Sequence, residues 1–104
     1  MELEIDLRHT PARCRLIDPD ELRSFAVVVV EAPRGEVSAW PPLIARHDEH
    51  VWVRIDALRA LARPSVGPDW ESGFAAMVEY ARGKGWVEDD AGSVRGHVER
   101  RTGP

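Results

Sequence analysis

The chain contains one cysteine, Cys14, and no long apolar run among its 104 residues. A single cysteine cannot form a disulfide within the chain, which fits a reducing compartment. No stretch approaches the ~20 apolar residues of a membrane span, and the acidic start Met-Glu-Leu-Glu-Ile-Asp is unlike a signal peptide. These absences predict a cytoplasmic protein. Arg13 and Arg15 flank Cys14, but neighbours in an extended segment point apart, so we expect an inert thiol.

Concentrated positive charge is also missing. The net charge is −4, and the densest basic stretches, 8–15 and 95–101, each hold only a few positive residues. Nonspecific binding to nucleic acids or to anionic membranes needs a concentrated positive surface. We therefore do not expect nucleic acid or a membrane as a partner.

The short motifs that assemble cofactor sites and catalytic sites are absent as well. The sequence has no glycine-rich phosphate loop, no nucleophile elbow, no paired-cysteine metal motif and no His-Glu-x-x-His pattern. We therefore expect no cofactor, no metal and no assembled catalytic motif. The composition disfavours an enzyme without excluding one.

The most informative feature that is present is Phe25 to Val30, a run of six apolar residues. In an extended strand such a run places apolar side chains on both faces of a sheet, so both faces need cover. The first strand, residues 2–7, instead alternates apolar and acidic residues, which is typical of a strand wet on one face. The second face of the central strand could be covered by the chain's own helix, a partner subunit or a ligand.

Caps and periodicity predict the remaining elements. We expect a short helix beginning at Asp18, a strand over 50–55, a short helix after Asp56, a longer helix after Asp69 and a hairpin over 86–99. Prolines and glycines predict a long turn or an edge excursion over 31–42, and 100–104 should fray. The prediction is one α+β domain over 1–104, a mostly antiparallel four- to five-stranded sheet with two main helices packed on one face.

The densest cluster of ionisable residues is His47-Asp48-Glu49-His50. Two histidines three apart chelate a metal on a helix, but the following Val-Trp-Val predicts a strand, where they fall on opposite faces. We expect a turn here and no metal site. The alternative is proton transfer by His47 or His50, with Asp48 orienting the imidazole.

Two tryptophans are candidates for recognition. Trp40 precedes two prolines in an irregular segment, and Trp52 shares its strand face with His50 and Arg54. An aromatic ring, an imidazole and a guanidinium on one face suit a ligand or partner surface. Trp40, His50, Trp52 and Arg54 are therefore the predicted binding residues, although a second packed layer or a dimer contact explains Trp52 equally well.

Three functional hypotheses follow. The leading one is a small binding or protein-interaction module that forms a homodimer or binds a protein partner through a face of its sheet. The alternative is a small enzyme or ligand-binding protein with a small-molecule pocket near Trp40, His47, His50, Trp52 and Arg54. The second alternative is a winged-helix-like nucleic-acid binder, since two helices precede a hairpin, but Glu71 and Glu79 on the longer helix oppose contact with phosphate.

Overall fold

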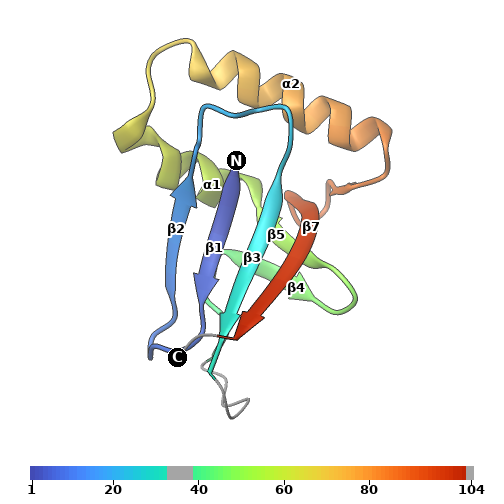
Figure 1. Cartoon of the computed structure of the whole chain (residues 1–104). Helices are drawn as coiled ribbons and strands as arrows, with labels where there is room; N and C mark the ends of the chain where they lie inside the picture. Colours follow the sequence, from blue (N-terminus) through green and yellow to red (C-terminus); the bar gives the residue numbers. More distant parts are fainter. Residues whose placement is uncertain (33–38, 103–104) are drawn as a thin grey trace.

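A curled mixed sheet with two helices forms the molecule, and the computed structural model describes residues 1–32 and 39–102 (Figure 1). The described strands are β1 (Glu2–Asp6), β2 (Arg13–Ile17), β3 (Ala26–Glu31), β4 (Ile44–His47), β5 (Val51–Arg54), β6 (Val87–Glu88) and β7 (Ser93–Thr102). The helices are α1 (Ile55–Ala62), the short 3-10 helix η1 (Arg63–Ser65) and α2 (Trp70–Gly83).

The strand order differs from the prediction. Within the described residues the sheet has seven strands, in the order β2-β1-β3-β7-β5-β4, with β6 paired to β7 off this path. β3 pairs in parallel with β1 on one side and with β7 on the other, and the remaining pairs are antiparallel. The predicted mostly antiparallel sheet of four to five strands is therefore wrong, although the α+β class holds. A continuous apolar strand is typical of parallel pairing, and this is how β3 is used.

Two of the missed strands carry little apolar signal. β2 has the sequence Arg-Cys-Arg-Leu-Ile and β4 has Ile-Ala-Arg-His. Both are outer strands of the sheet order, where one edge and one face meet solvent, so few positions need to be apolar. Part of the predicted turn over 31–42 lies at 33–38, outside the described residues.

The helix predicted from Asp18 does not form. Asp18 has a φ of 50°, and the amide of Glu21 donates to its carbonyl at 3.0 Å, which closes a single turn. The chain then runs straight into β3 at Ala26. A helix needs several turns to offset its nucleation, and the segment before β3 leaves no room for them.

The core lies between one face of the sheet and the two helices. Val51, Val53 and Ile55 point into it, as predicted, and so do Val94 on β7 and Leu58 on α1. The predicted stripe of α2 is confirmed at its buried positions Trp70, Phe74, Val78 and Ala81, with Met77 partly buried beside them.

The two faces of β3 are covered in different ways. Val27 and Val29 belong to the core, whereas Val28 points to the opposite face and is also completely buried. Its register partners there are Glu4 on β1 and Glu99 on β7. Long charged side chains can lie with their methylene groups against an apolar neighbour. Val28 is thus buried on the face of the sheet that points away from the core, between two strands that carry charged residues beside it.

The last strand belongs to two ladders. Residues 93–96 of β7 pair with β5, and residues 97–102 pair with β3. β6 pairs with Ser93 and Val94 on the same edge that β3 uses further along. β7 continues to Thr102, beyond the point where fraying was expected to begin. The winged-helix order of two helices and a hairpin is present, but the second hairpin strand is an integral part of the large sheet.

Candidate functional site

A hollow of about 700 Å³ lies between α2, the first half of β7 and the segment that leads into β3. Its described lining consists of Arg23, Ser24, Phe25, Glu49, His50, Met77, Tyr80, Ala81, Trp86, Val94, Arg95, Gly96, His97 and Val98. These residues come from four separate parts of the chain, so the hollow exists only in the folded state. Its volume suits a small organic molecule.

One wall of the hollow is aromatic and apolar. Tyr80 on α2 meets Trp86 edge to face, with ring centroids 6.3 Å apart, and Phe25 and Met77 also line it. Tyr80 is 64% exposed, and among the described residues it is the large hydrophobic side chain that stays open to solvent. An exposed ring at the mouth of a hollow is available to pack against an apolar ligand.

The part of the lining formed by β7 and the turn before β5 carries basic side chains and is here called the cationic wall. Arg95 and His97 project from β7, His50 lies in the turn before β5, and Glu49 is the acidic residue among the described lining residues. Arg95 forms no ion pair with another described residue, and its Cζ lies 5.8 Å from the centroid of the Trp52 ring. Arg23 is already held by Glu21, at 2.7 and 3.0 Å. Arg95 is therefore the guanidinium of this wall that can receive an anion.

Trp52 lies beneath charged side chains rather than on an open surface. Its side chain is 6% exposed. Arg46 lies over its ring, with Cζ 4.9 Å from the centroid, and also pairs with Asp48 at 3.1 Å and with Glu88. Two guanidinium groups, those of Arg46 and Arg95, thus make cation–π contacts with one indole.

Two polar atoms beside this stack are buried without a hydrogen-bond partner in the described part of the chain. They are Nε1 of Trp52 and Oγ of Ser93. Trp52 is opposite Arg95 in the β5–β7 register, and Ser93 is opposite Arg54, so all four positions share one face of the ladder. This face adjoins the cationic wall of the hollow.

The other predicted binding residues are split between two places. Trp40 stacks on His47, with ring centroids 4.3 Å apart and an interplanar angle of 15°. Arg54 is exposed and donates from Nε to the carbonyl oxygen of Pro42 at 3.2 Å. The fold therefore brings Trp40 together with His47, and places His50 in the hollow without Trp40, Trp52 or Arg54.

The 47–50 cluster is a tight turn, as expected. The amide of Asp48 donates to the carbonyl oxygen of His50 at 2.9 Å, and the amide of His50 donates to Oδ1 of Asp48 at 3.0 Å. This second bond is the main reason that the pKa of Asp48 lies below its ordinary value, with a smaller contribution from Arg46. Within residues 1–32 and 39–102, no three His, Cys, Asp or Glu side chains are grouped to hold a metal ion.

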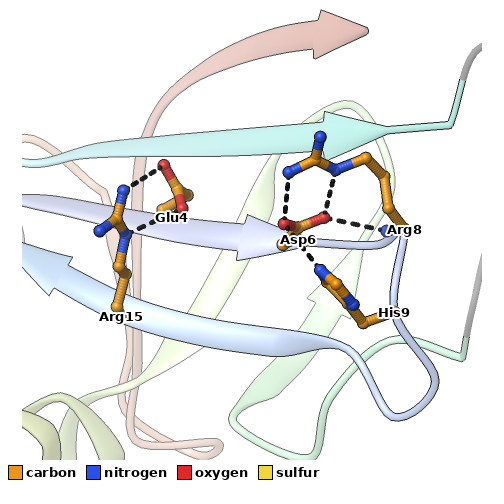
Figure 2. A network of polar contacts seen from close by, with 5 residues as sticks. All are labelled: Glu4, Asp6, Arg8, His9 and Arg15. Atoms are coloured by element: carbon orange, nitrogen blue, oxygen red, sulfur yellow. Dashed lines mark hydrogen bonds and ion pairs between the residues drawn. The ribbon is translucent and has the colours of Figure 1, made fainter. Parts of the chain in front are cut away.

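A separate polar network lies on the face of the sheet that points away from the core (Figure 2). Arg8 holds Asp6 through Nε at 2.9 Å and through a terminal nitrogen at 2.8 Å, and His9 approaches the same carboxylate at 3.5 Å. The hydrogen bonds from Arg8 lower the pKa of Asp6 to about 2. Along the strand, Arg15 pairs with Glu4 at 2.9 Å. Each carboxylate of this network is thus paired with a guanidinium.

The thiol of Cys14 is half-buried, and burial raises its pKa to about 11. This agrees with the expected inert cysteine, since the thiolate is the reactive form.

In the described part of the chain, no helix has the length and apolar character needed to cross a membrane. Comparison with protein-family models, curated proteins and solved structures gives no match.

Several lining residues were not predicted as site residues. Met77 and Trp86 were assigned to the core, and Tyr80 carried no signal, because only the packing of α2 against the sheet shows which rings stay open. Arg95 and His97 were expected to point outward from the hairpin, and they do. The outward position of Arg95 on the hairpin was the signal that could have indicated an anion site.

Proposed function

We propose that this chain is a small cytoplasmic binding protein whose ligand is an organic anion with an aromatic or other flat apolar group. The observation that carries the proposal is the hollow beside α2, whose lining combines the aromatic residues Tyr80 and Trp86 with Arg95, a guanidinium without an ion-pair partner among the described residues. The apolar group of the ligand packs against Tyr80 and Trp86, and its carboxylate or similar group binds Arg95. His50 and His97 also line the hollow, and an imidazole N–H can donate a hydrogen bond to the same anionic group.

Binding titrations with 2-naphthoate and its neutral analogue 2-naphthamide test this proposal. We expect the naphthoate to bind more tightly, with amide NMR shifts concentrated at the hollow. Arg95→Gln should weaken naphthoate binding about tenfold, since a hydrogen bond to a charged group contributes ~1.5–3 kcal/mol, and should leave naphthamide binding unchanged. Arg63→Gln, an exposed charge on η1 outside the lining, is the matched control. Equal binding of the two probes, or an equal effect of the two variants, would refute the proposal.

The second candidate is a self-associating protein-interaction module. The observation that favours it is the outer edge of β7, which has no strand beside it over residues 97–102 in the described part of the chain. Open strand edges recruit further strands. Sedimentation velocity up to about 1 mM protein tests it, because edge contacts bury less area than a stable interface and associate weakly. A monomer over the whole range would exclude self-association.

A further inference from the structure

The open edge of β7 differs in exposure from the rest of the strand. Residues 93 and 94 are buried between β5 and β6, whereas His97, Glu99, Arg100, Arg101 and Thr102 are exposed. β5 reaches only to Val51, opposite Gly96, so its ladder ends where the open edge begins. Figure 1 shows β7 at the outer side of the layer formed with β1, β2 and β3.

The direction of the backbone groups on this edge follows from one hydrogen bond. The amide of His97 donates to the carbonyl oxygen of Phe25, on the side of β3. Backbone N–H and C=O groups alternate between the two edges of a strand, so those of Val98, Arg100 and Thr102 point to the open edge. The backbone N–H and C=O groups of these three residues can therefore form hydrogen bonds with a further strand.

The charged side chains on this edge are complementary to those of a second copy of the chain. A two-fold axis perpendicular to the sheet keeps each face on the same side, so odd positions meet odd positions and even positions meet even ones. One register places Glu99 opposite Glu99, which is repulsive. The next places Arg100 opposite Arg100 and Glu99 opposite Arg101, twice by symmetry. In that register Glu99 of each copy lies opposite Arg101 of the other copy, and cross-strand pairs of opposite charge are stabilising.

The like charges at the centre of this register are already compensated. Arg100 is paired with Glu31 on the adjacent strand β3 within its own chain. Glu99 and Arg101 are 3.1 Å apart in one chain, on the same face, and the register places a second such pair beside them. Four charges of alternating sign then form one group. The outward groups of Val98, Arg100 and Thr102 supply up to about six backbone hydrogen bonds across the axis.

We propose that two copies of this chain associate edge to edge through β7, antiparallel, with Arg100 on the two-fold axis and Glu99 of each copy opposite Arg101 of the other. This inference rests on the proposed self-association and names its surface. The outcome is one continuous sheet running through both copies.

Charge reversal tests this register. Glu99→Arg places two positive pairs across the joint, and Arg101→Glu places two negative pairs, so each variant alone should associate at least about tenfold more weakly than the wild type. An equimolar mixture of the two variants should restore association, because arginine at 99 then faces glutamate at 101 and the native Arg101 faces the native Glu99. Glu79→Arg on α2, which breaks the exposed pair with Arg82, is the matched control and should associate like the wild type.

A backbone variant provides the second measurement. Arg100→Pro removes an N–H that points to the open edge, and the β3 ladder does not use it. It should abolish association while the circular dichroism spectrum stays native. A dimer that survives all three edge variants would overturn the β7 joint while upholding self-association, whereas a monomeric wild type would overturn both. Failure of the mixture to restore association would overturn the proposed register.

Discussion

Gly96 makes a close contact that a single methyl group can probe. A Cβ built at this position would lie 2.8 Å from Cδ2 of Phe25 and 3.0 Å from its carbonyl oxygen. The ring can rotate, but the carbonyl is fixed, because it accepts the amide of His97 at 3.3 Å. Gly96→Ala must therefore separate β7 from the chain just before β3, or displace the ring of Phe25 into the hollow.

Two opposing effects set the magnitude. Overpacking a close contact destabilises a protein by about 1–3 kcal/mol. Replacing glycine by alanine also restricts the unfolded chain, which stabilises the folded state by about 0.4–1 kcal/mol. We expect Gly96→Ala to lower the free energy of unfolding by about 1–2 kcal/mol. For a domain of this size, each kcal/mol corresponds to a Tm change of about 4–8 °C.

Urea unfolding followed by circular dichroism measures the effect, with Gly83→Ala as the matched control. A Cβ at Gly83 meets nothing within 4 Å, and the residue ends α2, so alanine there should stabilise the protein by up to about 1 kcal/mol. The same substitution should thus lower the free energy of unfolding at Gly96 and raise it at Gly83. A Gly96→Ala protein at least as stable as the wild type would refute the close approach of β7 to Phe25.

Three further results are expected. The pKa of Asp6 is lowered to about 2 from 3.8, so its ion pair stabilises the fold above about pH 4 and is lost as the pH falls towards 2. In urea titrations, Asp6→Asn should therefore reduce the loss of stability between about pH 5 and pH 2.5. Glu21, whose pKa is also about 2, continues to titrate in this variant. Trp70→Phe removes the hydrogen bond from Nε1 to the carbonyl oxygen of Pro19 at 2.7 Å and should lower the free energy of unfolding by about 1 kcal/mol. Cys14, with a pKa of about 11, should react with an aromatic disulfide reagent far more slowly in the native protein than in urea, and equal rates would contradict its burial.

The sequence predicted those elements whose pattern is set by local physics. The apolar stripe of α2 from Trp70 to Ala81, the alternation of β5 and the hairpin of β6 and β7 all lie where periodicity and turn residues indicated them. The core was also predicted at Val51, Val53 and Val94. Each of these segments buries one defined face, so the spacing of its apolar residues indicates both the type of element and the face that is buried.

Strand pairing was the part that the sequence did not reveal. The run from Phe25 to Val30 is typical of a parallel strand, but it does not show which distant strands, here β1 and β7, are its partners. Its two covered faces were correctly inferred, since Val27 and Val29 are buried on one face and Val28 on the other, where its register partners are Glu4 and Glu99. For the same reason the hollow was missed, since its walls come from α2, β7 and the turn at His50.

The position of β7 between two ladders has a kinetic consequence. Ala26 pairs with His97, far along the chain, so β3 cannot complete its hydrogen bonds until β7 has been synthesised. Closing so long a loop is slow, and parallel pairs of high contact order are formed late. Until then the valine-rich β3 exposes an unsatisfied edge, which makes the newly made chain prone to aggregation. The same strand that unites the sheet therefore determines how long the edge of β3 stays open during folding.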